Sequence, residues 1–114
     1  MHKDLIAYKK RMELVNDVYF ITKRFPDDEK FCLVNQMRRA AVSIPSNISE
    51  SAARKNKKEF IQFLYISLGS LSELETQIEI SGNLGYHNNK SEFEDRIKYI
   101  RNLITGLIRK LNNS

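Results

Sequence analysis

Apolar residues recur along this 114-residue chain at steps of three and four, which is the spacing of one face of an α-helix. Four segments carry the pattern, and we expect helices over about residues 4–24, 29–54, 60–84 and 91–111. The last segment is the most regular, because its apolar positions follow the steps of a heptad seam: Phe93, Ile97, Ile100, Ile104, Leu107 and Leu111. The pattern therefore predicts an all-α protein.

Two prolines interrupt the first half of the chain. Pro26 is expected to end the first helix, because the residue before a proline is disfavoured from the helical conformation. Pro45 lies inside the second segment, where it removes one backbone hydrogen bond and clashes with the preceding turn, so we expect a kink around residues 42–46. Asn47 followed by Glu50 resembles a capping box that restarts the helix. We therefore predict one helix that is kinked near Pro45.

Short connections between four helices predict an antiparallel up-down four-helix bundle, formed by a single domain over residues 1–114. Four Gly and two Pro are too few for the many tight turns of a β-sandwich. No signal-peptide core follows the N-terminus, and no apolar run approaches the roughly 18 residues of a membrane span. We therefore expect a cytoplasmic protein that does not enter a membrane.

The first half of the third segment is apolar on nearly every side. A helix of this kind must be buried on more than one face, whereas each helix of a four-helix monomer keeps one face in water. We therefore expect a subunit interface here in addition to the core. Its candidate residues are Phe60, Ile61, Phe63, Tyr65 and Leu68.

The formal net charge of +5 is unevenly distributed. Residues 59–89 contain four acids and no Lys or Arg, whereas residues 1–24, 25–58 and 90–114 each carry three more bases than acids. Lys and Arg gain affinity for phosphates by releasing counterions, so basic clusters are candidate nucleic-acid contacts. The candidates are Arg38, Arg39, Arg54, Lys55, Lys57 and Lys58. For any one cluster, ordinary solubilising surface is the alternative.

A polar row accompanies the apolar row around Pro45. Its residues follow steps of four, four and three, and they are Arg39, Ser43, Asn47 and Glu50. We interpret them, together with Glu73 of the third segment, as a hydrogen-bonded network that holds the kink and sets the helix register. Direct ligand binding by the same residues is the alternative.

The residues of a catalytic or metal site are missing from the sequence. Cys32, His2 and His87 are the only thiol and imidazole groups, and no spacing among them matches a metal-ligand motif. No glycine-rich phosphate loop is present. We therefore expect a non-enzymatic protein with no cofactor, no metal and no small-molecule substrate.

One stretch resembles a known family. The run from Gln36 to Glu50, QMRRAAVSIPSNISE, is similar to the signature of the bacterial four-helix bundle proteins called ribosomal RNA intervening-sequence proteins. The similarity extends to residues 58–60, 69–71, 73–76 and 84–86, and so covers almost the whole chain. Ser49-Glu50-Ser51 stands where the family often has Ala-Glu-Gly, and Ser67 where it often has Ala. These changes keep small side chains, so the fold inference is unaffected.

The resemblance implies a four-helix bundle that assembles as a homopentamer. Some relatives are encoded inside insertions of the large-subunit ribosomal RNA gene. Others, the accessory variability determinants of diversity-generating retroelements, work with a reverse transcriptase and bind nucleic acid through a basic surface. We therefore expect a homo-oligomer that binds RNA or an RNA-associated partner, such as a reverse transcriptase-type protein. The alternative is a protein–protein interaction scaffold without intrinsic nucleic-acid binding.

Overall fold

The computed structural model describes the backbone of residues 2–114 and the side chains of residues 7–114, so the side chain of His2 lies outside the described residues. The elements in chain order are α1 (His2–Thr22), the short 3-10 turn η1 (Asp27–Glu29), α2 (Leu33–Ala52), α3 (Lys57–Asn83) and α4 (Lys90–Asn112). The predicted all-α fold with four helices is confirmed.

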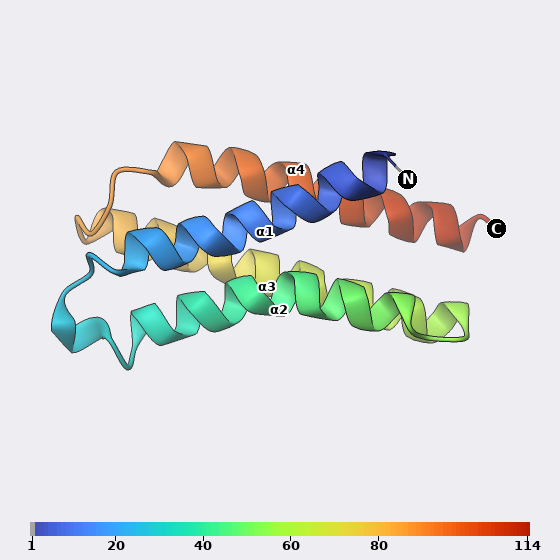
Figure 1. The fold of residues 1–114 in the computed structure, drawn as a ribbon, viewed down its shortest axis with the longest axis horizontal. Helices are drawn as coiled ribbons and strands as arrows, with labels where there is room; N and C mark the ends of the chain where they lie inside the picture. Colours follow the sequence, from blue (N-terminus) through green and yellow to red (C-terminus); the bar gives the residue numbers. More distant parts are fainter. Residues whose placement is uncertain (1) are drawn as a thin grey trace.

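Successive helices run in opposite directions along the long axis of the molecule, and both termini lie at the same end (Figure 1). The principal extents are 47 × 24 × 19 Å. Each helix contacts its neighbours in the sequence, and α4 also contacts α1, which closes the bundle. The two ends of the bundle therefore hold different connections: α1 to α2 and α3 to α4 at one end, and α2 to α3 at the other.

Side chains from all four helices meet in one core. They lie at the three- and four-residue steps of the sequence pattern, which places them on one face of each helix. Those with 0 or 1% exposure are Leu14, Val18, Met37, Ala41, Ile44, Leu64, Leu71, Leu74, Ile78, Ile97 and Ile100. Full burial of an aliphatic side chain of this size contributes roughly 1.5–3 kcal/mol.

The second segment forms one helix through Pro45, as predicted, but the helix does not restart there. The helix is unbroken from Leu33 to Ala52 with Pro45 inside it, so the predicted restart by a capping box is wrong. Asn47 instead donates from Nδ2 to the carbonyl oxygen of Ser43 and to its Oγ, both at 2.8 Å. Buried Ala41 and Ile44 precede Pro45, and buried Ser51 follows it, so packing on both sides outweighs one lost backbone bond. A bend at Pro45 stays a prediction.

The start of α2 also differs, because the chain from residue 27 to residue 29 forms only the turn η1. Tertiary contact accounts for the later start. The Tyr86 hydroxyl donates to Glu29 Oε2 at 2.9 Å, so a side chain from the α3–α4 connection holds this segment. Local helix propensity could not indicate a partner that lies 57 residues away.

Helices α2 and α3 form the most extensive contact in the bundle. Small side chains line it, and two of them form hydrogen bonds between the helices. Ser67 Oγ donates to the Ile44 carbonyl oxygen at 2.9 Å, and Ser70 Oγ lies 2.8 Å from Ser43 Oγ. Small residues let two helix backbones approach closely, and each buried hydroxyl is satisfied by the other helix. We call this contact the serine seam.

Candidate functional site

Four of the six predicted phosphate contacts gather at the α2–α3 connection, and we call Arg54, Lys55, Lys57 and Lys58 the basic tip. Arg54 forms an ion pair with Glu50, and its guanidinium lies 4.6 Å from the centre of the Phe63 ring. Lys57 Nζ donates to a backbone oxygen of Ser114 at 3.2 Å. Lys55 and Lys58 are exposed and pair with none of the residues that the structure describes.

The other two predicted contacts, Arg38 and Arg39, lie about 24 Å away along α2 at a rise of about 1.5 Å per residue. Arg38 is held by α1: its Nε donates to Thr22 Oγ1 at 2.9 Å, and its guanidinium lies 4.6 Å from the centre of the Tyr19 ring. Arg39 is exposed. The structure therefore separates the six candidates into two groups and ties Arg38 into the bundle.

The predicted polar row does not form one continuous network. Ser43 and Asn47 are joined by hydrogen bonds, and Ser70 extends them to α3. Glu50 instead faces Arg54. The other two members of the predicted network, Arg39 and Glu73, line a polar groove of about 430 Å³ beside the serine seam, together with Gln36, Ala40, Ser43 and Ser70. Glu73 Oε2 accepts a hydrogen bond from Gln77 at 3.1 Å.

The sequence prediction missed Ser70 and Ser67 in this network. The signal was present, because Ser67 and Ser70 lie three residues apart and so share a helix face. The sequence alone does not show whether these two serines are buried or exposed to solvent. Their role depends on which face α3 turns towards α2.

The predicted oligomer interface lies along the first half of α3. Phe60, Ile61 and Leu68 are half-buried and pack against the core of their own chain. Phe63 is half-buried beneath the Arg54 guanidinium. Tyr65 remains open to solvent, with 56% of its surface exposed, and the adjacent Ile66 is 49% exposed. Packing within the chain therefore explains why part of this segment is apolar. It does not explain the exposed side chains of Tyr65 and Ile66.

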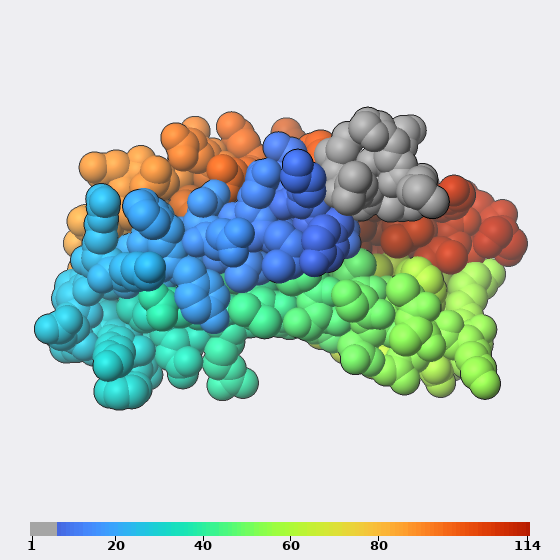
Figure 2. All heavy atoms as spheres, viewed as in Figure 1, coloured from blue at the N-terminus to red at the C-terminus, as the bar shows by residue number. Residues whose placement is uncertain are grey.

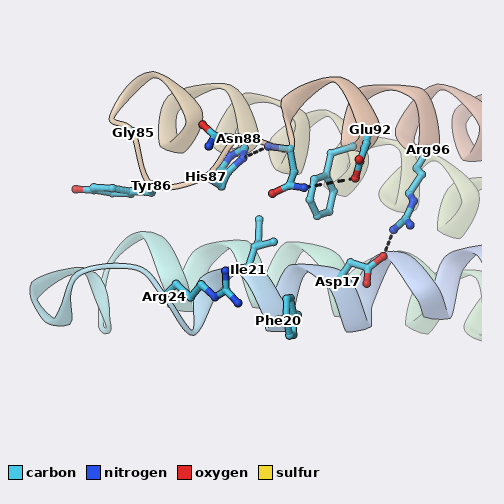
Figure 3. A pocket seen from close by; sticks show the side chains of 12 residues that line it. Asp17, Phe20, Ile21, Arg24, Gly85, Tyr86, His87, Asn88, Glu92 and Arg96 are labelled. Carbon is cyan, nitrogen blue, oxygen red and sulfur yellow. Dashed lines mark hydrogen bonds and ion pairs between the residues drawn. The ribbon is translucent and has the colours of Figure 1, made fainter.

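A cleft of about 470 Å³ opens at the opposite end of the bundle from the basic tip, between α1 and the α3–α4 connection (Figure 3). Sequence reasoning did not find it, because its two walls come from residues far apart in the chain. One wall belongs to α1, and the other to the connection and the first turns of α4. Its lining residues are Asp17, Phe20, Ile21, Arg24, Gly85, Tyr86, His87, Asn88, Asn89, Glu92, Phe93 and Arg96.

His87 forms the floor of this cleft and is bonded at both ring nitrogens. Nδ1 accepts from the Asn89 backbone N–H at 3.0 Å, so Nε2 carries the proton and donates to the Ile78 carbonyl oxygen at 3.0 Å. The ring is stacked on Phe25, with 6.4 Å between centroids. Gly85, at φ +82°, gives the chain the left-handed turn that begins the connection. The floor is therefore a fixed part of the fold.

Tyr86 links the same connection to η1. Its hydroxyl donates to the Glu29 carboxylate, and this hydrogen bond raises the pKa of Tyr86 above its usual value near 10. At the far end of the cleft, Arg96 of α4 forms an ion pair with Asp17 of α1. A polar contact therefore holds the walls in place at each end of the cleft: Tyr86 with Glu29 at one end, and Arg96 with Asp17 at the other.

Comparison with known proteins identifies the family. Residues 3–111 match the family of 23S rRNA-intervening sequence proteins. The chain belongs to this family. The match covers nearly every residue of the four helices, as the resemblance of residues 36–50 indicated.

A protein of known structure shares the fold. The crystal structure of a protein of unknown function from the S23 ribosomal protein family of Bacteroides thetaiotaomicron superposes with a TM-score of 0.79. The two chains are 21% identical, and the similarity covers 90% of this chain and 97% of the other. Among curated proteins, none matches this chain.

The part of the chain that the structure describes contains neither a metal-binding cluster nor a membrane-spanning helix. No three His, Cys, Asp or Glu side chains among residues 7–114 gather in a way that could hold a metal ion. None of the described helices has the length and apolar character needed to cross a bilayer.

Proposed function

We propose that this protein is a non-enzymatic, self-associating helical module that binds RNA or an RNA-associated partner through its basic tip. The observation that carries the proposal is the gathering of four cations within five residues, with Lys55 and Lys58 exposed and unpaired among the described residues. Membership of a family named for the intervening sequence of 23S rRNA supports RNA as the ligand class.

Lysines on a protruding connection suit phosphate binding. Each phosphate that a Lys or Arg neutralises releases condensed counterions, so affinity rises with the number of contacts and falls as salt is added. The proposal assigns the main phosphate contacts to Lys55, Lys57 and Lys58. Arg54 contributes a further contact while it remains paired with Glu50. Arg38 contributes less, because its guanidinium is already held by α1.

Self-association would multiply this surface. The homopentamer implied by the family resemblance would place five basic tips in one particle. Tyr65 and Ile66 support an interface on α3. Both are large apolar side chains with about half of their surface exposed, and exposed apolar surface of this kind marks interaction sites. Tyr65→Glu is the sharper test of the interface, since Ile61→Glu would also disturb the chain's own core.

The proposal contains no catalytic step. His87 is the one histidine whose side chain is described, and it uses both ring nitrogens to hold the α3–α4 connection. A general base needs a ring nitrogen that can reach a substrate proton.

The experiment is the binding of labelled structured RNA and duplex DNA at low and near-physiological salt. Wild type is compared with the triple variant Lys55→Glu, Lys57→Glu, Lys58→Glu. The matched control carries Lys23→Glu, Lys98→Glu and Lys110→Glu, which changes the charge by the same amount at exposed sites elsewhere. We expect a steep salt dependence and a loss of RNA affinity in the tip variant well beyond that of the control. Equal losses in both variants would mean that bulk charge, and not the tip, binds RNA.

The second candidate function, a protein–protein interaction scaffold, is favoured by exposed apolar residues of α3 and of the connection that follows it. Tyr65, Ile66, Ile80 and Leu84 are each 45% or more exposed. If wild type binds neither RNA nor DNA at physiological salt, and Tyr65→Glu still changes its oligomeric state on sizing, this candidate replaces the first.

A further inference from the structure

The cleft between α1 and the α3–α4 connection lies at the opposite end of the bundle from the basic tip. Phe20 exposes 58% of its surface beside it, and the Arg24 guanidinium lies 5.3 Å from the centre of the Phe20 ring. The guanidinium of Arg24 forms no hydrogen bond or ion pair with any described residue. A planar cation on an exposed aromatic ring, with its donors unused, offers a flat face for another planar group.

The comparison with Arg38 shows what is unusual here. Arg38 also lies over an aromatic ring, that of Tyr19, but two hydrogen bonds to α1 hold its guanidinium. That pair therefore serves helix packing. The Phe20–Arg24 pair lacks such bonds and remains available to a ligand.

The opposite wall supplies groups that both donate and accept hydrogen bonds. Asn88 is exposed at the rim, and Asn89 Nδ2 is only weakly engaged, 3.4 Å from Glu92 Oε2. A carboxamide can donate and accept at once, which matches the edge of a nucleobase. Figure 3 shows Asn88 on the wall opposite Arg24 and Ile21.

Charge and rigidity narrow the ligand class. Four charged side chains line the cleft, two of each sign, and one of each is consumed in the Arg96–Asp17 ion pair. A site without net charge disfavours a bare phosphate and suits a neutral planar group. The bonded floor at His87 is already in place before any ligand arrives, which reduces the ordering cost of binding.

We propose that this cleft binds one unpaired nucleobase, stacked on the Phe20–Arg24 pair and hydrogen-bonded by Asn88 or Asn89. RNA as the source of the base rests on the function proposed above. A base inside a duplex is stacked and paired on both sides, so the cleft selects a loop, bulge or end. The basic tip then contacts phosphates, and the cleft selects RNA that carries an unpaired base.

The first test compares an RNA hairpin with an unpaired loop to a blunt duplex of the same stem. Phe20→Ala is measured beside Phe31→Ala, a matched control whose ring is 84% exposed and does not line the cleft. We expect wild type to prefer the hairpin. Phe20→Ala should weaken hairpin binding roughly fivefold or more, the usual effect of removing one stacked aromatic, and leave duplex binding unchanged. Phe31→Ala should change neither.

Hairpin and duplex RNA bound with equal affinity would overturn the inference while leaving RNA binding intact. So would equal effects of the two Phe variants. Thermal unfolding of both variants checks that each is folded. We expect both to fold, because the two rings are exposed and contribute little to the core.

If wild type binds neither RNA, the proposed function fails, and a second measurement then decides the cleft alone. Adenosine, guanosine, cytidine and uridine are titrated singly at millimolar concentration, followed by NMR. Shifts at the backbone amides of residues 85–89 that Phe20→Ala abolishes would support the base site. Unmoved amides with all four nucleosides would overturn it.

Discussion

The serine seam between α2 and α3 differs in kind from the contact between α1 and α4. The seam is the most extensive contact in the bundle, and serine hydroxyls cross it at 2.8 and 2.9 Å. Among the described residues, helices α1 and α4 share the least extensive helix–helix contact, which includes an ion pair between partly exposed side chains. We therefore expect the seam side to be the more stable half of the molecule. The cleft opens beside the less extensive contact.

The seam side of the bundle holds the fold together, whereas the candidate cleft lies on the side of α1. Buried contacts on the seam side fix helix register. The cleft opens on the other side, beside α1. In the space-filling view, the described part of α1 (blue) lies between α4 (orange) and α2 (green) (Figure 2). The basic tip lies where the seam helices are joined, so rigid packing positions its lysines.

The largest expected effect comes from truncating the seam core. Ile44 is completely buried and its carbonyl oxygen accepts from Ser67. Ile44→Ala should lower the free energy of unfolding by about 2–5 kcal/mol through lost burial and the cavity that remains. Urea unfolding measures it, with Ile80→Ala on the exposed face of α3 as control. Similar losses in both variants would contradict a tightly packed seam.

Enlarging a seam serine should have the next largest effect. Ser67 is completely buried, and valine would remove its hydrogen bond and force the helices apart. We expect Ser67→Val to cost about 1–3 kcal/mol in unfolding free energy. Ser72→Val, at an exposed position of the same helix, should cost much less. If both variants unfold alike, close approach of α2 and α3 does not depend on the small residue.

The ion pair on the looser side should contribute little. The Asp17 and Arg96 side chains are about 40% exposed, so solvent screens their attraction. A double-mutant cycle with Asp17→Asn and Arg96→Gln should give a coupling free energy of at most about 1 kcal/mol, falling as salt is added. A larger, salt-independent coupling would show that α1 and α4 are held as firmly as the seam.

The smallest expected effect concerns pH. The Glu29 hydrogen bond raises the pKa of Tyr86, so the neutral phenol is favoured in the folded state. Its stabilisation is present below the unfolded pKa of about 10 and is lost as pH rises through the folded value. Wild type should therefore lose more stability than Tyr86→Phe between neutral and strongly alkaline pH. If the unfolding free energies of the two proteins change in parallel with pH, the Tyr86–Glu29 hydrogen bond does not stabilise the contact between the α3–α4 connection and η1.

At Pro45 and at Arg38, tertiary contacts decide what the local sequence leaves open. Pro45 disfavours a helix locally, but Ala41 and Ile44 before it and Ser51 after it are buried, so the helix continues through it. Arg38 resembles its neighbour Arg39 in the sequence, but only Arg38 reaches Thr22 of α1. Local propensity and charge counts do not include partners brought together by folding.

The sequence by itself determined the four helices, their apolar faces and the family, because helical periodicity and a specific residue run are local properties of the chain. Only the tertiary structure decided which polar groups are used up and which remain available. Arg38 is bonded to α1, whereas the Arg24 guanidinium has no such bond to any residue that the structure describes. The cleft beside Arg24 exists because residues near 20 and near 88 meet when the bundle closes, and no local pattern encodes that meeting.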